Sequence, residues 1–246
     1  MQIIKSTLIS KYPELIFGLS TKIGLERTAP YFLNMSLTVA DDIETVKQNR
    51  EAFFKEIGLN SSQIAFQKQI HSDIITVVNE AGLIGESDAM ISAKPGIGLA
   101  ISTADCTSIF IYDKRNRLIA AVHSGWRGTT KKILKKTLIR LKEEYNSRAD
   151  DLIVYVGPSI SQKNYEVGEE IAQQFDKKYL RYENNKIYLD VARANLDMIY
   201  NFGVQTNQVE QSPLCSFEEK NLLHSYRRDG KLSGRSLGII ALKVNG

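Results

Sequence analysis

The residues of this chain best suited to chemistry are two histidines and a cysteine at the ends of apolar, strand-like runs. His71 ends one run, Cys106 begins another directly after Asp105, and His123 ends a third, just before the Gly-Trp-Arg-Gly segment at 125–128. The whole sequence holds only three histidines and two cysteines. Two imidazoles and a thiolate suit Zn²⁺ and leave one coordination position for water or substrate. If these three side chains converge, the sequence predicts a metalloenzyme site.

The same residues allow other interpretations. Cys106 could be a thiolate nucleophile with His123 as its base, which would make the protein a cysteine hydrolase or deamidase. Cys106 could also be packed core, because unpaired cysteines are among the most buried residues. A zinc-bearing interaction protein is a further alternative, since a structural zinc site has four protein ligands and His224 or Cys215 could supply the fourth. The residues alone leave these interpretations open.

Charged residues near these segments could bind an anion or move a proton. Arg127 precedes Gly128 and a predicted helix start at Thr129 or Thr130, where unpaired N–H groups favour negative charge. A basic loop at 225–235, which contains Arg227, could clamp phosphate through guanidinium hydrogen bonds. Salt bridges or a solvated turn would explain the same arginines. Trp126 could stack on a base or sugar, but we expect it to wedge its loop against the core. Asp105 could orient a metal ligand, carry a proton or simply cap a helix or turn.

Strand-like runs must position these side chains. Runs of apolar residues predict strands at 15–19, 64–69, 74–78, 89–91, 98–102, 108–112, 118–122, 152–156, near 187 and at 237–244. Helical spacing and caps predict helices from Asp41 or Asp42 to about Ile57 and at 129–145, 167–178 and 190–202. Runs that are apolar throughout indicate strands buried on both faces.

One strand pair carries most of the prediction for the site. The runs 108–112 and 118–122 are joined by a turn at 113–116, which predicts an antiparallel hairpin. Such a hairpin would bring Cys106 and His123 together at its open end, because neighbouring strands lie about 4.8 Å apart. His71 must arrive from a different part of the fold.

Composition bounds the class of protein. The chain has 246 residues, of which 43% are hydrophobic, and we find no linker, so we expect a single domain over 1–246. A net charge of +4 is compatible with anionic ligands but does not indicate nucleic-acid binding. The sequence predicts no membrane span and no secretory signal, so free thiols and a cytoplasmic location are expected. The oligomeric state is not predicted.

An ordered set of segments resembles the YfiH/YlmD family, long labelled laccase-domain or polyphenol oxidase proteins. The segments are 34–37, 41–42, 49–50, 69–71, 103–106, 121–128, 157–160, 165–168 and 225–230. The resemblance spans nearly the whole chain, and the segment around His123 is its most specific part. This chain departs from the family pattern at 38–40, where members often carry His-Val-Gly, and at His224, where members often carry an aromatic residue.

The resemblance implies a fold, a metal and an activity. The fold would be α/β (α+β), a single domain layered α-β-β-α with mixed β-sheets. Zinc would be held by His71, Cys106 and His123, with Asp105, Cys106 and His123 as catalytic residues. The implied activity is purine nucleoside phosphorolysis, in which adenosine, inosine, guanosine or methylthioadenosine reacts with phosphate to give the base and a ribose 1-phosphate. The resemblance also implies adenosine deaminase activity.

Five further residues are candidates for holding the substrates of such a reaction. Arg50, Arg127 and Arg227 are the candidates for phosphate, and Asn34 and Gln69 are the candidates for hydrogen bonds to sugar or base. Preorganised charge of this kind can contribute several kcal/mol to a barrier.

The older oxidase label can be tested by counting histidines. Copper sites of the blue type use two histidines and a cysteine, whereas the resemblance to multicopper laccases would require about eight more histidines for a trinuclear cluster. This sequence has three histidines in all, so it cannot supply that set. One copper ion could occupy the single site in vitro, because Cu²⁺ generally binds more tightly than Zn²⁺. Phenol oxidation would then be a side activity.

Overall fold

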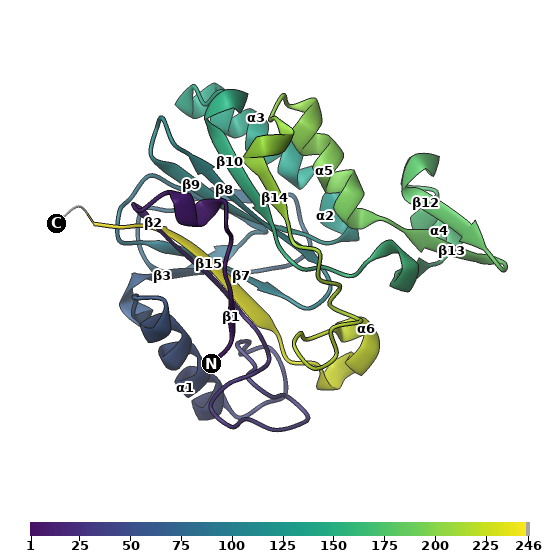
Figure 1. The fold of residues 1–246 in the computed structure, drawn as a ribbon, viewed down its shortest axis with the longest axis horizontal. Coiled ribbons are helices and arrows are strands. Elements are labelled where there is room, and N and C mark those ends of the chain that lie inside the picture. Colours follow the sequence, from purple (N-terminus) through teal and green to yellow (C-terminus); the bar gives the residue numbers. More distant parts are fainter. Residues whose placement is uncertain (245–246) are drawn as a thin grey trace.

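Two six-stranded β-sheets pack face to face in the computed structural model, which describes residues 1–244 (Figure 1). Sheet A contains, in spatial order, β1 (Ile3–Ile4), β2 (Leu15–Ser20), β15 (Ser236–Leu242), β7 (Gly98–Thr103), β3 (Ile64–Lys68) and β5 (Gly82–Glu86). Sheet B contains β14 (Val209–Gln211), β10 (Leu152–Val156), β8 (Thr107–Asp113), β9 (Leu118–Ser124), β6 (Ala89–Ser92) and β4 (Ile75–Val77). Both sheets mix parallel and antiparallel pairs: β3 and β7 are parallel, for example, whereas β8 and β9 are antiparallel.

Helices cover the outer faces of both sheets, while aromatic side chains fill the space between them. Phe17 of sheet A contacts Phe110 and Tyr155 of sheet B edge-to-face, with ring centroids 5.1 and 5.0 Å apart. The helix α1 (Ile43–Glu56) packs on sheet A, and α3 (Ile133–Tyr145) and α5 (Val191–Asn201) pack on sheet B (Figure 1). The mixed α/β fold with mixed sheets that the resemblance implied is therefore confirmed.

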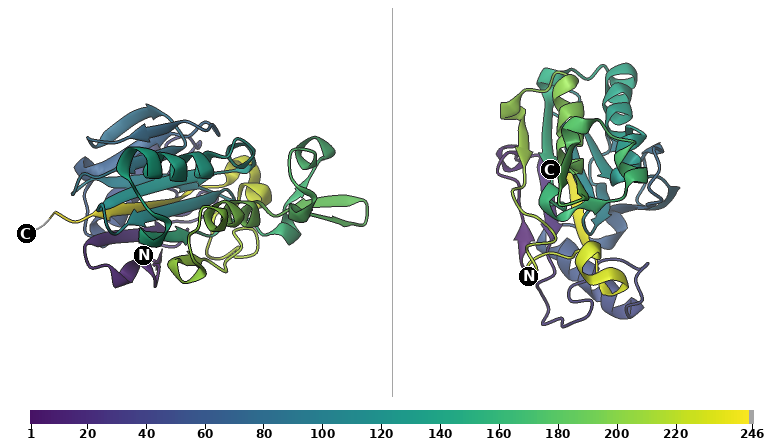
Figure 2. Two further views of the ribbon diagram at one scale, coloured as in Figure 1. Left: turned by 90° about the horizontal axis from the view of Figure 1, so that it is seen from above. Right: turned by 90° about the vertical axis from the view of Figure 1, so that its right-hand side faces the viewer.

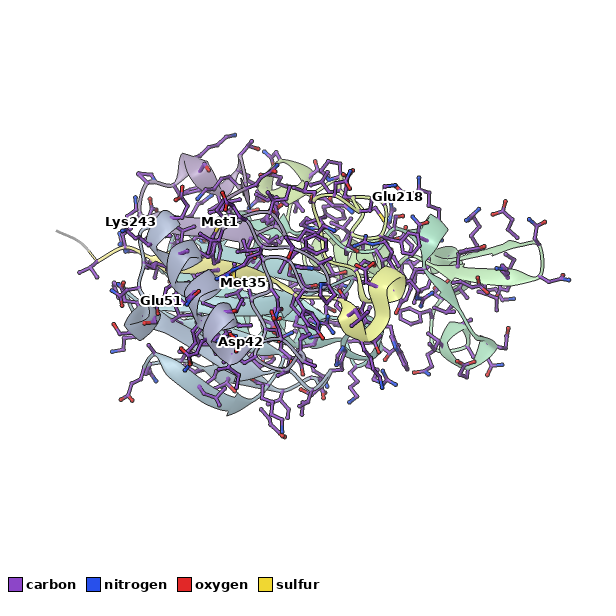
Figure 3. All side chains as sticks on the ribbon, turned by 90° about the horizontal axis from the view of Figure 1, so that it is seen from below. Met1, Met35, Asp42, Glu51, Glu218 and Lys243 are labelled. Carbon is purple, nitrogen blue, oxygen red and sulfur yellow. The ribbon has the colours of Figure 1, made fainter. Side chains whose placement is uncertain are left out.

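The first helix begins and ends as its sequence predicts. The Asp42 carboxylate accepts a hydrogen bond of 2.7 Å from Thr45 N, which caps the helix. Gly58 follows the helix at a φ of +82°, a conformation that ends helices and favours glycine. Figure 3 shows α1 from its outer side, with Asp42 at its start and Glu51 farther along it.

Two predicted helices are wrong in their bounds. The helix expected at 129–145 is divided into α2 (Trp126–Thr130) and α3, because Lys132 takes a left-handed φ of +62° between them. The helix expected at 167–178 is reduced to α4 (Glu169–Ala172), which follows the short strand β11 (Glu166–Val167). The apolar residues of this segment pack in a small separate core instead of lining one face of a long helix. None of the helices within residues 1–244 combines the length and apolar character needed to cross a bilayer.

A three-stranded sheet projects from the main body in the views of Figures 1 and 2. It consists of β11, β13 (Lys186–Leu189) and β12 (Leu180–Glu183), in that order. We call residues 165–190 the arm. Trp126 packs against the core of the arm, which includes Val167 and Leu189. This contact confirms the expected wedging role of Trp126.

The prediction missed five strands, namely β1, β5, β11, β12 and β14. The strand β5 contains Gly82 and Gly85 at φ of +110° and +96°, and glycine in a strand weakens the pattern that identifies one.

Candidate metal centre

Two crossings of the chain from sheet A to sheet B build the site. The first connects β3 to β4 and carries His71, and the second connects β7 to β8 and carries Cys106. Both crossings turn sharply, with left-handed φ values of +57° at His71 and +90° at Asp105. Such values are uncommon for residues other than glycine and concentrate at functional sites.

The predicted hairpin of β8 and β9 supplies the third side chain. The strands are antiparallel, and Ser108 pairs with His123 while Thr107 pairs with Ser124. Cys106, directly before β8, therefore lies beside the end of β9. The hairpin predicted from the sequence is confirmed, together with the proximity that it implied.

The donor atoms of His71, Cys106 and His123 lie within 4.8 Å of one another. Cys106 Sγ is 3.8 Å from His71 Nε2, and the two imidazole rings stand 4.9 Å apart at 77°. Zinc bonds of about 2.0–2.3 Å in tetrahedral geometry hold their ligands about 3.5 Å apart, so only a small closure of this cluster is needed. The donor set and its spacing fit zinc.

Gly125 makes room for these donor atoms. A Cβ at this position would lie 2.7 Å from Cys106 Sγ and 3.1 Å from His71 Cδ2. Its φ of −73° is open to any residue, so close approach to the donor atoms, and not backbone conformation, accounts for glycine here.

A buried aspartate that the sequence analysis missed supports the cluster. Asp88, which is fully buried before β6, accepts hydrogen bonds from His123 Nδ1 at 2.8 Å and from His71 N at 3.1 Å. It also accepts bonds from the backbone of Ile70 and from the backbone and hydroxyl of Ser72. The only signal in the sequence is an acidic residue directly before the apolar run at 89–91.

The charges of these groups act strongly on one another. Burial raises the pKa of the Cys106 thiol, but His123 and His71 outweigh it and hold that pKa below its usual value. Burial lowers the pKa of His123, but Cys106 and Asp88 outweigh it and raise that pKa above its usual value. Burial likewise opposes ionisation of Asp88, yet its hydrogen bonds to His123 and Ser72 bring its pKa to about 2. The cluster therefore favours a thiolate, which is the form of cysteine that binds metal.

Asp105 and Arg227 lie together next to the cluster. Asp105 Oδ1 accepts from Ser216 Oγ and Oδ2 accepts from the backbone N–H of Arg227, both at 2.6 Å. The Arg227 guanidinium lies over the Tyr165 ring and donates to the carbonyl of Glu166. Asp105 therefore anchors the loop that carries Arg227 through Oδ2 and the segment at Ser216 through Oδ1.

The Arg127 side chain is exposed and lies over the ring of Trp126, 4.2 Å from its centroid. Arg127 is the second residue of α2, which begins two residues after the end of β9. An exposed guanidinium at this place can meet a soluble anion without leaving a buried partner.

The other predicted substrate residues are occupied by protein partners. Asn34 is fully buried, and its amide bonds with Ser36, Asp41 and the backbone of Arg235. The Gln69 amide pairs with the backbone N–H and carbonyl of Ser102, both at 2.8 Å. These amides fix loops of the protein, and a substrate would have to displace those bonds.

Arg50 is also engaged within the protein. Its Nε donates to Met35 O at 2.7 Å, and its guanidinium lies over the Phe66 ring. Burial lowers the pKa of Arg50 to about 10. This environment is that of a packed structural arginine on α1.

Within the described residues 1–244, the metal-ligating group contains His71, Cys106 and His123 and no fourth member. His224 Nε2 faces the carbonyl of Leu33 at 3.4 Å, and Cys215 Sγ accepts from Ser161 N at 3.3 Å. Three protein ligands are typical of a catalytic zinc site, which keeps an open position, whereas a structural site has four.

Two more residues lie in the electrostatic field of the cluster. Burial lowers the pKa of Arg235, and the negative charges of Asp105 and Cys106 act in the opposite direction. Burial raises the pKa of the Tyr165 hydroxyl, and Cys106 raises it further. Arg235 belongs to the basic loop noted in the sequence, but nothing in its spacing distinguished it from its neighbours.

A groove of about 470 Å³ lies elsewhere, beside α5. Its lining includes Phe175, Tyr179 and Met198 but none of the three cluster residues. The candidate metal centre is therefore separate from this groove.

Comparison with known proteins agrees with the fold. A family model described as "Multi-copper polyphenol oxidoreductase laccase" matches residues 17–243. Among solved structures, the chain is similar to YfiH from Bacillus licheniformis, with a TM-score of 0.91 and 26% identity over 96% of this chain and 95% of that one. It is similar to YlmD from Geobacillus stearothermophilus, with a TM-score of 0.90 and 26% identity over 95% and 93% of the two chains.

Three curated proteins of related sequence have names that describe an activity. A protein of Bacteroides thetaiotaomicron called purine nucleoside phosphorylase is 33% identical over 220 residues, which cover 82% of each chain. One of the same name from Clostridium acetobutylicum is 34% identical over 228 residues, covering 88% of this chain and 90% of that one. A protein called adenosine deaminase RL5, from an unknown prokaryotic organism, is 28% identical over 229 residues, covering 85% and 87%.

Proposed function

The chain belongs to the family described as multi-copper polyphenol oxidoreductase laccase, the family of YfiH and YlmD, and we propose that it is a zinc-dependent purine nucleoside phosphorylase. Its substrates would be adenosine, inosine, guanosine or methylthioadenosine together with phosphate. The names of its relatives support this class of enzyme. We propose further that residues 1–246 form one domain of this type.

The observation that carries the proposal is the three-donor cluster of His71, Cys106 and His123. Three ligands rather than four are what a zinc ion needs to take part in a reaction. When bound, zinc would supply Lewis acidity at the position that these side chains leave open. The residues of the chain itself would bind and orient the two substrates beside that position.

Phosphate would be held by Arg127 and Arg227. A guanidinium has five N–H donors in a planar fork that suits phosphate oxygens. The Arg227 side chain uses Nη1 on the carbonyl of Glu166, which orients the exposed fork and would leave its other donors for phosphate. The glycosidic bond breaks with positive charge developing on the sugar, and a phosphate held beneath the anomeric carbon would both attack and stabilise that charge.

Asp105 would orient this clamp. Both of its oxygens accept hydrogen bonds, one from Ser216 Oγ and one from Arg227 N. A carboxylate held in this way fixes the backbone of Arg227 relative to Cys106, the next residue in the chain. We therefore assign Asp105 the task of positioning Arg227, in place of the proton transfer that its residue type alone suggested. Asn34, Gln69 and Arg50 would support loops around the site through the bonds described above.

Adenosine deamination is a second candidate activity, supported by the similarity to adenosine deaminase RL5. The same cluster suits it, because hydrolytic deamination needs an activated water next to the purine. Phenol oxidation by bound copper would be a side activity, since three histidines cannot build a multicopper cluster.

A single set of incubations tests the proposal. Purified protein is incubated with adenosine or inosine, with and without phosphate, and the products are separated by chromatography. Phosphate-dependent release of free base is expected, whereas inosine formed from adenosine without phosphate would identify the deaminase. Release of base that does not depend on phosphate would rule out phosphorolysis.

A chelator separates this proposal from a cysteine hydrolase that uses Cys106 and His123. Removing the metal should abolish a zinc-dependent reaction and expose Cys106 to iodoacetamide. A thiolate enzyme would keep its activity in chelator and lose it first to iodoacetamide. The Cys215→Ala variant is the matched control, because its thiol lies outside the cluster.

A further inference from the structure

We propose that Asp88 is a positioning residue that holds two of the three metal-binding side chains, His71 and His123, in the arrangement that binds metal. This inference rests on the zinc site of the proposed function. It assigns a role to a side chain that binds neither metal nor substrate in that proposal. Asp88 is fully buried, and every side-chain hydrogen bond that it makes is to the His71 loop or to His123.

The side chain of Asp88 only accepts hydrogen bonds. Oδ1 accepts from His71 N and His123 Nδ1, and Oδ2 accepts from Ile70 N, Ser72 N and Ser72 Oγ. An ionised carboxylate can accept at both oxygens and donates at neither. It is therefore the one common side-chain group that satisfies all of these donors at once.

The bond to His123 determines which ring nitrogen can bind metal. Asp88 Oδ1 lies 2.8 Å from His123 Nδ1, so this nitrogen carries a hydrogen and Nε2 is left for the metal. Carboxylates that bond to metal-binding histidines in this way fix the ring orientation and raise its basicity. The backbone N–H of His123 also donates to the carbonyl of Asp88 at 2.7 Å, so both ends of the histidine are held.

The hydrogen bonds that join Asp88 to the connection between β3 and β4 hold the backbone of His71 in a conformation that would otherwise be unfavourable. His71 has a φ of +57°, and it is flanked by Ile70 and Ser72, whose N–H groups point at the same carboxylate. Three consecutive N–H groups that converge on one side chain define the path of the loop. Asp88 thereby couples the backbone of one metal-binding residue to the ring of another.

Asparagine cannot replace this carboxylate. If the asparagine oxygen takes the position of Oδ2, its NH₂ group takes the position of Oδ1 and faces the His71 N–H, which is also a donor. His123 Nδ1 must then accept a hydrogen bond, so the ring hydrogen moves to Nε2 and prevents that nitrogen from binding metal. If the amide is reversed, its NH₂ group faces the N–H groups of Ile70 and Ser72. An aspartate-to-asparagine change next to a catalytic histidine is known to impose the wrong tautomer by the same logic.

The test compares Asp88→Asn with Asp113→Asn. Asp113 is also buried and accepts only from N–H groups, those of Arg115 and Asn116, but it lies at the opposite end of the β8–β9 hairpin. Zinc affinity is measured by competition with a chelator, folding by thermal melting, and ligand geometry by the absorption spectrum of the cobalt-loaded protein. Asp88→Asn should bind zinc about 10- to 100-fold more weakly and change the cobalt spectrum. Asp113→Asn should lose stability but keep both metal properties.

Each outcome decides a separate question. Wild-type protein without zinc affinity would overturn the proposed metal site and the role of Asp88 with it. Tight zinc binding by wild type and equally tight binding by folded Asp88→Asn would overturn the positioning role alone. If Asp88→Asn does not fold, Ser72→Ala removes one donor to Oδ2 and should weaken zinc binding roughly two- to tenfold. Unchanged affinity in that variant would overturn the positioning role.

Discussion

The Gly125→Ala substitution tests the geometry of the candidate metal centre with one added methyl group. A Cβ at this position would lie 2.7 Å from Cys106 Sγ, and ordinary contacts begin at 3.4 Å, so the two atoms must separate by 0.7 Å. The backbone at Gly125 has φ −73° and ψ 178°, which alanine adopts without strain. The whole effect should therefore fall on the donor atoms.

Folding and metal binding should respond differently. Overpacking costs about 1–3 kcal/mol, while replacing glycine by alanine at a compatible backbone position gains about 0.4–1 kcal/mol by restricting the unfolded chain. The metal-free protein can relieve the overlap by moving the sulfur. Zinc must draw the sulfur back, so the cost of about 1–3 kcal/mol reappears as weaker binding, which is about 5- to 150-fold in affinity.

The assay measures zinc affinity by chelator competition and stability by thermal melting, on Gly125→Ala and on Gly128→Ala as the matched control. The Cβ added at Gly128 would meet Ile133 Cγ2 at 3.2 Å and the backbone carbonyls of Ser72 and His123 at 3.4 and 3.5 Å, and none of these atoms is a metal donor. The control should keep its zinc affinity. If folded Gly125→Ala binds zinc as tightly as wild type, the metal does not lie among His71, Cys106 and Gly125.

Three further substitutions test other parts of the site. His123→Ala should lose bound zinc and both activities, while His224→Phe should keep its zinc; full zinc occupancy in His123→Ala would contradict the ligand assignment. Arg127→Ala should raise the KM for phosphate far more than it changes metal content, and an unchanged dependence on phosphate would exclude its anion-binding role. Burial lowers the pKa of His224 to about 4. As the pH falls from about 6.5 to 4, this histidine therefore becomes protonated in the unfolded chain but stays neutral in the folded protein, which favours unfolding. Wild type should lose about 3 kcal/mol of stability over this range because of His224, and the loss should be smaller in His224→Phe; equal pH dependence in urea unfolding would refute the argument.

Local patterns predicted the parts of the site that depend on neighbouring strands. The turn at 113–116 and two short apolar runs were enough to bring Cys106 next to His123, because a hairpin is set by residues close in sequence. The crossing that carries His71 could not be predicted in this way. It depends on which strand belongs to which sheet, and that is decided by packing across the whole molecule.

Hydrogen-bond partners were the weakest part of the prediction. Asn34 and Gln69 have side chains that could bind a sugar, but the structure uses those amides to fix loops. For Asp88 the prediction failed in the opposite way, because a residue that supports the site was overlooked. One acidic residue before an apolar run is a common feature of sequences. Residue type states what a side chain can bond to, whereas only the fold determines which bonds are already made.

The two crossings explain how the fold brings the three donor side chains together. His71 and Cys106 lie where the chain passes from sheet A to sheet B, and His123 lies on sheet B itself, so the donors come from both layers of the fold. The layers are already held together by aromatic contacts between Phe17, Phe110 and Tyr155. The donors are therefore brought together by the sheets and by Asp88, and a bound metal adds stability only in proportion to its occupancy and affinity. In a site built in this way, little of the free energy of metal binding is lost in ordering the ligands. The affinity is then determined by the donor atoms and their spacing.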